Sequence, residues 1–193
     1  MKKTVLTGMT LGVALAAAVP MTAVAGEGTA NVALVSDYLW RGDATGDASL
    51  QGGYDYDFGN GFSAGVWGST LTGDFEYDLY GGYAGKAGEM DYSVGYIYYG
   101  YQNATAASEY NLGLGFKDVS FMYSADTAST ATYMELGYEM DLSGVGVGFH
   151  YGTNGITPDY SIGASKDFSG YNVGLTFASK TTTAFALSVS KEF

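Results

Sequence analysis

Apolar and polar residues alternate along most of this chain, and residues 50–69 show the alternation most clearly. In the first half of this segment every second residue is apolar or glycine, and the residues between them include Asp55 and Asp57. A period of two places alternate side chains on opposite faces of a β-strand. The sequence Gly-Asn-Gly at 59–61 tolerates the positive φ angles of a tight turn. This stretch therefore predicts a β-hairpin with one apolar and one polar face.

The same alternation recurs down the chain and predicts about twelve strands, with no convincing amphipathic helix. The predicted strands cover residues 29–41, 50–58, 62–69, 75–85, 90–99, 108–116, 119–125, 132–140, 145–151, 160–168, 171–178 and 183–193. Their connections alternate in length. We expect short turns near residues 60, 87, 118, 142 and 169, longer loops near 45, 103, 129 and 155, and two further short connections near 72 and 181.

The polar faces of these strands are crowded with glycine and carboxylates and hold almost no lysine, which is not the composition of a solvated outer surface. The pattern favours an all-β fold, a transmembrane antiparallel up-and-down β-barrel with lipid outside and water inside. A soluble β-sandwich or lipocalin-like barrel, with the aromatic residues in its core, is the alternative.

Aromatic residues occur where the edges of a bilayer would lie. One group, near the short turns, comprises Phe58, Phe62, Phe116, Phe168 and Tyr171. A second group, near the longer loops, comprises Tyr38, Trp40, Tyr98, Tyr101, Tyr110, Tyr151 and Tyr160. We expect both groups to face lipid.

The N-terminus has the features of a secretory signal peptide. Basic Lys2 and Lys3 precede an apolar run from residue 5 to 19, and Ala23-Val-Ala25 supplies the small residues that signal peptidase requires. We therefore expect residues 1–25 to be removed and residues 26–193 to form one barrel domain. An N-terminal membrane helix is the alternative, but the run is shorter than the ~20 apolar residues that a bilayer requires.

Composition narrows the function classes further. The predicted mature chain has 6 basic and 20 acidic residues, a formal charge of −14, which argues against nucleic acid as a partner. The chain has no cysteine, so disulfides and thiolate metal sites are excluded. No later segment has ~18 consecutive apolar residues, so membrane residence would have to be through strands.

Residues 34–70 carry a resemblance to a known family. Ser36-Asp-Tyr-Leu-Trp-Arg-Gly42, Gln51-Gly-Gly and Gly65-Val-Trp-Gly-Ser69 are similar to the motifs of the TorF-type porins of proteobacteria. The resemblance implies a small outer-membrane barrel of about twelve strands. It also implies that the terminal Phe193 is the signal read by the barrel-insertion machinery, although Lys191 stands where that signal usually has an apolar residue.

By the alternation, a set of polar and acidic side chains is expected to line the lumen. The candidate pore-lining residues are Asp37, Arg41, Gln51, Asp55, Asp57, Trp67, Glu76, Asp78, Asp91, Glu109, Glu135 and Glu139. An excess of carboxylates concentrates cations and repels anions. The other interpretation is that these acids are solvated and have no selecting role.

Two of these residues have alternative roles. Arg41 is expected to form an ion pair with Asp37, Asp55 or Asp57, or else to contact the solute. Trp67 is expected to stack on a solute or narrow the pore, or else to pack over the periplasmic end.

The leading hypothesis is a porin of the Gram-negative outer membrane for small neutral or cationic solutes. Its partners are outer-membrane lipid, the insertion machinery and small solutes; no cofactor or metal is expected. A non-conducting barrel with a structural or surface-binding role is the alternative. An enzyme is not expected. His150-Tyr-Gly-Thr-Asn154 is only faintly similar to the His-x-Ser arrangement of outer-membrane phospholipase, and His150 is expected to face inward, away from lipid.

Overall fold

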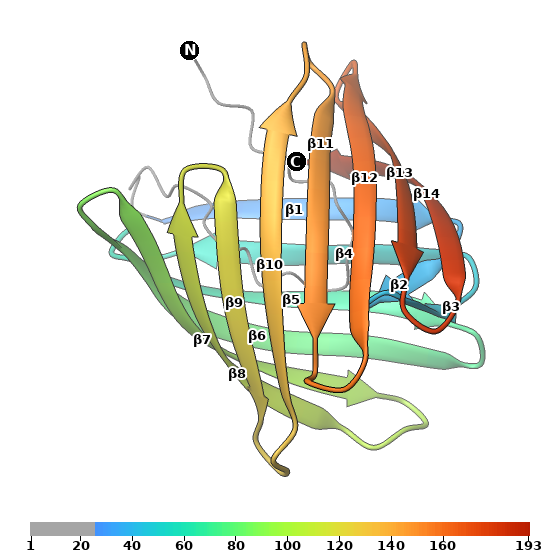
Figure 1. The fold of residues 1–193 in the computed structure, drawn as a ribbon, viewed down its shortest axis with the longest axis horizontal. Helices are drawn as coiled ribbons and strands as arrows, with labels where there is room; N and C mark the ends of the chain where they lie inside the picture. The colour runs from blue at the N-terminus through green and yellow to red at the C-terminus, as the bar shows by residue number, and fades with distance from the viewer. Residues whose placement is uncertain (1–25) are drawn as a thin grey trace.

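The computed structural model describes residues 26–193, so the predicted signal peptide lies outside the described residues. Twelve antiparallel strands form a closed barrel, because β1 pairs with β14 on one side and with β4 on the other (Figure 1). The strands of the wall are β1 (Glu27–Val35), β4 (Ser49–Asp57), β5 (Phe62–Leu71), β6 (Asp74–Ala87), β7 (Met90–Tyr101), β8 (Ala107–Phe116), β9 (Val119–Asp126), β10 (Thr132–Asp141), β11 (Gly146–Thr153), β12 (Pro158–Phe168), β13 (Tyr171–Ser179) and β14 (Thr183–Glu192). The predicted fold class is confirmed.

The two faces of the wall differ as the alternation predicts. Apolar side chains on alternate positions are exposed on the outside of the barrel, for example Leu34, Leu112 and Leu187, which are 62%, 53% and 60% exposed. The positions between them hold mostly small, polar and acidic residues, with a few large ones such as Ile97 and Met122, and most of them are buried or half-buried. This is the inverse of a soluble protein, and it is the arrangement of a membrane-spanning barrel. Residues 26–193 contain no helix long and apolar enough to cross a membrane.

The connections at 58–61, 88–89, 117–118, 142–145 and 169–170 lie at one end of the barrel, which we call the short-turn end. The longer loops lie at the other end, together with the two further short connections expected near 72 and 181. Ser169 and Gly170 link β12 to β13 with φ angles of 58° and 85°, the signs that a two-residue type I′ turn requires. At the same end the C-terminal residue closes the wall, because the amide of Phe193 donates to the carbonyl of Ala30 over 2.8 Å and the amide of Ala30 donates back over 3.2 Å.

The predicted first strand, 29–41, is wrong beyond residue 35. β1 ends at Val35, and the chain then forms a separate two-stranded sheet, β2 (Tyr38–Trp40) and β3 (Asp43–Gly46), within what was expected to be the end of a strand and a loop. The physical reason is a bend at the polar residues Ser36 and Asp37, after which the chain no longer follows the wall. Three aromatic residues expected to face lipid do not: Tyr38 is 5% exposed, Trp40 lies on this hairpin against the ring of Tyr99, and the Tyr101 hydroxyl donates to the inward Glu76.

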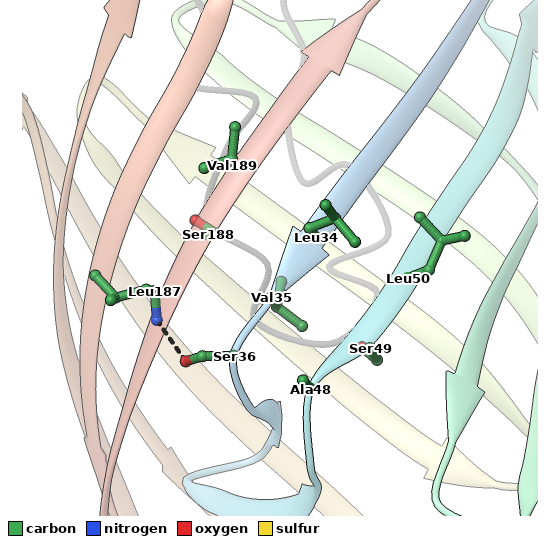
Figure 2. Close-up of a pocket in the computed structure, with 9 residues that line it drawn as sticks. All are labelled: Leu34, Val35, Ser36, Ala48, Ser49, Leu50, Leu187, Ser188 and Val189. Carbon is green, nitrogen blue, oxygen red and sulfur yellow. Dashed lines mark hydrogen bonds between the residues drawn. The ribbon is translucent and has the colours of Figure 1, made fainter.

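A hollow of about 400 Å³ lies at the seam between β14, β1 and β4, where the chain leaves the wall after β1 (Figure 2). Its lining is largely apolar and includes the exposed side chains of Leu34, Leu50 and Leu187. Ser36 keeps the seam paired: its amide donates to the Leu187 carbonyl, and its hydroxyl accepts from the Leu187 amide, each over 2.9 Å.

Candidate functional site

The hairpin of residues 36–48 leaves the wall and runs against residues of the opposite strands. Its turn consists of Arg41 and Gly42, with Trp40 paired to Asp43 across it. Both turn residues have positive φ, 45° and 82°, which is the type I′ geometry that favours glycine in the second position. Arg41 adopts the left-handed region without being glycine, so its side-chain contacts must offset about 1 kcal/mol of backbone strain.

Arg41 makes those contacts on the far side of the barrel. Its Nη2 donates to Oε2 of Glu109 on β8 over 2.8 Å, and both side chains are mostly shielded from solvent. The guanidinium also lies 4.1 Å from the ring centroid of Tyr133 on β10. The same carboxylate accepts a hydrogen bond from the hydroxyl of Tyr99 on β7. The expected partners of Arg41 were Asp37, Asp55 and Asp57, and that expectation is wrong because the hairpin carries the guanidinium across to β8.

The base of the hairpin packs on other strands. Leu39, 1% exposed, forms a small apolar cluster with Ala178 on β13 and Ala186 on β14. Tyr38 stacks on Trp67 of β5 with ring centroids 6.1 Å apart. Trp67 therefore supports the hairpin from the middle of β5 and does not pack over the short-turn end, which was expected to be periplasmic.

The Tyr38 hydroxyl lies beside the carboxylate of Glu76 on β6. Burial, and then the negative charge of Glu76, raise the pKa of Tyr38 well above its usual value, so the hydroxyl remains a donor.

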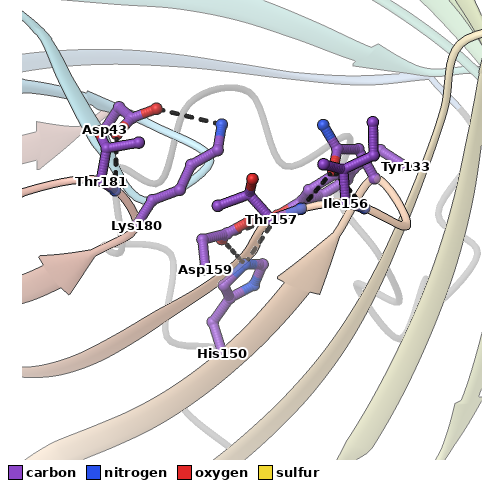
Figure 3. A network of polar contacts seen from close by, with 9 residues as sticks. Asp43, Tyr133, His150, Ile156, Thr157, Asp159, Lys180 and Thr181 are labelled. Atoms are coloured by element: carbon purple, nitrogen blue, oxygen red, sulfur yellow. Dashed lines mark hydrogen bonds and ion pairs between the residues drawn. The ribbon is translucent and has the colours of Figure 1, made fainter.

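A second ion pair connects the hairpin to the loop between β13 and β14 (Figure 3). Nζ of Lys180 lies 3.1 Å from Oδ2 of Asp43, and the hydroxyl of Thr181 donates to Oδ1 over 2.9 Å. Partial burial acts to raise the pKa of Asp43, but the hydrogen bonds from Lys180 and Thr181 outweigh it and hold that pKa below its usual value.

Beside the hairpin tip, three side chains from three strands form a buried polar network, also drawn in Figure 3. The hydroxyl of Tyr133 donates to the carboxylate of Asp159 at 2.9 and 3.0 Å, and Nε2 of His150 lies 2.9 Å from Oδ1 of Asp159 and 3.1 Å from the Tyr133 oxygen. Asp159 is fully buried, and its Cβ lies against Gly42.

The predicted pore-lining residues divide into two groups. Those on wall strands all occupy inward-facing positions: Gln51, Asp55, Asp57, Trp67, Glu76, Asp78, Asp91, Glu109, Glu135 and Glu139. The other two lie on the chain between β1 and β4: Asp37 at the bend, where its carboxylate accepts from the Ser36 hydroxyl, and Arg41 at the hairpin turn.

Several inward acids have local partners, but Asp78 does not. Asp55 accepts from the Tyr80 hydroxyl over 2.6 Å, and Glu76 accepts from the Tyr101 hydroxyl over 3.0 Å. Asp78 is fully buried, and neither carboxylate oxygen has a hydrogen-bond partner within residues 26–193. Burying an ionised carboxylate without a partner is unfavourable by several kcal/mol in order of magnitude. A proton or a cation on Asp78 would offset that cost.

Three residues that hold the hairpin were not predicted from the sequence. Tyr133 and Asp159 meet its tip, and Lys180 meets β3. Asp159 was not predicted because the strand was expected to begin at residue 160, two residues later than it does; within β12, Asp159 follows the inward parity of Ser161. Groups of three or more potential metal-ligating side chains are absent from the part of the chain that the structure describes.

The profile of the family Gcw_chp, described as a bacterial protein of unknown function, matches residues 20–191. The chain belongs to the Gcw_chp family. Comparison of this Gcw_chp protein with curated proteins gives no match.

Solved structures resemble this Gcw_chp barrel at low sequence identity. KdgM porin superposes with a TM-score of 0.66 at 10% identity, over 86% of this chain and 98% of that one. KdgM porin in complex with disordered oligogalacturonate gives 0.62 at 9% identity, over the same shares of the two chains. At such identity the likeness establishes a porin-like barrel fold and carries no information about solute.

Proposed function

We propose that, after removal of residues 1–25, this protein is a Gram-negative outer-membrane porin that passes small neutral or cationic solutes through a narrow acidic lumen. The observation that carries the proposal is the sorting of charge across the wall. Every aspartate and glutamate on the twelve wall strands, within residues 26–193, occupies an inward position, while the outward positions are mostly apolar and hold no acid. Acidic lumens favour cations.

The size of the barrel supports a narrow path. Eight strands give an interior that side chains can fill and sixteen leave an aqueous channel, so twelve strands fall between the two cases. Inward glycines such as Gly113, Gly148 and Gly163 take up little of that space. The hairpin 36–48 reduces it at the loop end, through contacts with β8, β10 and the β13–β14 loop.

The acidic lumen argues against the inference that this protein shares the solute of its structural neighbour. Oligogalacturonate, named with KdgM porin, carries a carboxylate on each sugar unit. Such a polyanion would be repelled by the inward acids. The similarity of residues 34–70 to TorF-type porins supports a porin without naming a solute, and the terminal Phe193 is proposed as the insertion signal.

The hairpin also favours a second candidate, a non-conducting barrel whose loops bind a surface partner. Conductance of the purified protein in a planar bilayer distinguishes the two candidates, because the absence of single-channel steps would refute the porin proposal. In a salt gradient the reversal potential should show cation preference, and anion preference would refute the role of the carboxylates. The double variant Glu135→Gln, Glu139→Gln should reduce that preference. The control, Glu89→Gln with Asp118→Asn, makes the same charge change in two turns outside the wall and should leave it unchanged.

A further inference from the structure

The outer surface of the barrel has a charge pattern opposite to that of the lumen. Among residues 26–193, the charged residues at outward positions of the wall strands are both lysines, Lys166 on β12 and Lys191 on β14. Both lie at the short-turn end of the barrel. Their acidic neighbours in sequence, Asp167 and Glu192, take inward positions, so the outward strand positions at this end carry two positive charges and no negative one.

Each of these lysines lies over aromatic rings that are themselves exposed. Nζ of Lys191 is 4.9 Å from the ring centroid of Tyr171 and 5.0 Å from that of Phe193, and Nζ of Lys166 is 5.8 Å from that of Phe168. Within the described residues neither ammonium has a carboxylate at salt-bridge distance. Cation–π contacts orient the ammonium groups without using up their three N–H donors.

The five residues form one patch, which we call the basic rim. Phe168 pairs with Tyr171 across the β12–β13 turn, and continuation of the β13–β14 register places Lys191 beside Tyr171. Lys166 lies two strands away from Lys191 and two residues further from the edge. With strand spacings of about 4.8 Å and a rise of about 3.4 Å per residue, their Cα atoms are about 12 Å apart. Both flexible side chains can therefore reach the same layer of headgroups.

We propose that the basic rim binds the phosphate of an anionic phospholipid in the periplasmic leaflet. This inference rests on the membrane residence proposed above, because the short-turn end of such a barrel faces the periplasm. The rings suit the boundary between acyl chains and headgroups, and the ammonium groups supply the charge that an anionic headgroup requires. Phosphate is favoured over a carboxylate-bearing protein because the rim lies on the lipid-exposed wall, not on a loop.

The test is headgroup preference of the folded barrel, measured by native mass spectrometry after release from nanodiscs that contain phosphatidylglycerol and phosphatidylcholine with identical acyl chains. The wild type should retain phosphatidylglycerol preferentially, and less so at high salt. In Lys166→Gln, Lys191→Gln the preference should fall roughly fivefold for each lysine removed. The variant Lys166→Arg, Lys191→Arg should keep the preference for phosphatidylglycerol, because the positive charge is required and not the lysine side chain itself.

Lys86→Gln is the matched control, because Lys86 lies at the same end of the barrel but faces inward and pairs with Asp91. It removes one positive charge, as each single substitution in the rim does, and should bind lipid as the wild type does. The inference would be overturned if the wild type retained both headgroups equally, or if the preference were unchanged in Lys166→Gln, Lys191→Gln. Neither result would contradict the porin proposal. Insertion is measured separately, by heat-modifiable migration on a gel, and a protein that fails to insert would overturn both proposals.

Discussion

Gly42→Ala should release the hairpin 36–48 from the opposite wall. A Cβ added at this glycine would lie 2.4 Å from the Asp159 Cβ and 3.1 Å from the Lys180 Cβ, whereas ordinary contacts begin at 3.4 Å. The hairpin tip must therefore withdraw by about 1 Å to restore van der Waals contact. The φ of 82° adds a penalty of about 1 kcal/mol for any residue with a side chain.

The withdrawal also weakens the principal ion pair. The Arg41–Glu109 distance of 2.8 Å would grow to about 3.8 Å, beyond hydrogen-bonding range. A hydrogen bond to a charged group contributes about 1.5–3 kcal/mol. Together the two effects give about 2.5–4 kcal/mol, or roughly two to three powers of ten in the ratio of docked to undocked hairpin.

Trypsin reports this ratio directly, because the peptide bond after Arg41 lies at the hairpin tip. Purified folded protein is treated with trypsin, and the fragment ending at Arg41 is followed over time by mass spectrometry. Gly42→Ala should be cleaved there much faster than the wild type. Gly46→Ala is the control: it lies in the same hairpin, its φ is not in the left-handed region, and its added Cβ meets Tyr38 at an ordinary 3.4 Å. Equal rates of cleavage in the two variants would refute the docking argument.

Three further outcomes are expected. Leu39→Ala removes a fully buried side chain and should destabilise the docked hairpin by about 2–4 kcal/mol, measured as faster tryptic cleavage with unchanged sheet content by circular dichroism. Lys180→Gln should raise the pKa of Asp43 toward its usual value in a carboxyl NMR titration. Because the pKa of Asp43 is lower in the folded than in the unfolded state, the Lys180–Asp43 pair stabilises the fold at pH values above the unfolded-state pKa. That stabilisation is lost as the pH falls through the folded-state pKa. If the pKa of Asp43 is the same in Lys180→Gln as in the wild type, Lys180 is not the cause of the shift. Deletion of Phe193 removes two backbone hydrogen bonds at the seam and should slow barrel assembly, followed by gel mobility of the heated and unheated protein.

The alternation of residue types decided most of the fold by itself. Side chains on a strand point alternately to two faces, so the residue types within each segment indicate whether lipid or water lies on each side. Strand number, turn lengths and the inward placement of acids on the wall such as Glu76 and Asp91 follow from this pattern within each segment. None of these three features requires knowledge of which strands are neighbours, because an up-and-down barrel pairs each strand with the next.

The hairpin was decided only by the closed barrel. The alternation assigned Tyr38 and Trp40 to the lipid face, because it carries no information about the inward turn of the chain at Ser36. Two features of the sequence did indicate a break in the strand: the polar pair after β1, and the Arg41-Gly42 turn. The contacts that hold it join residues 68 and 138 positions apart in sequence, Arg41 to Glu109 and Asp43 to Thr181. Such contacts exist only after β1 and β14 have met, because closure of the wall brings strands that are distant in sequence to within reach of one loop.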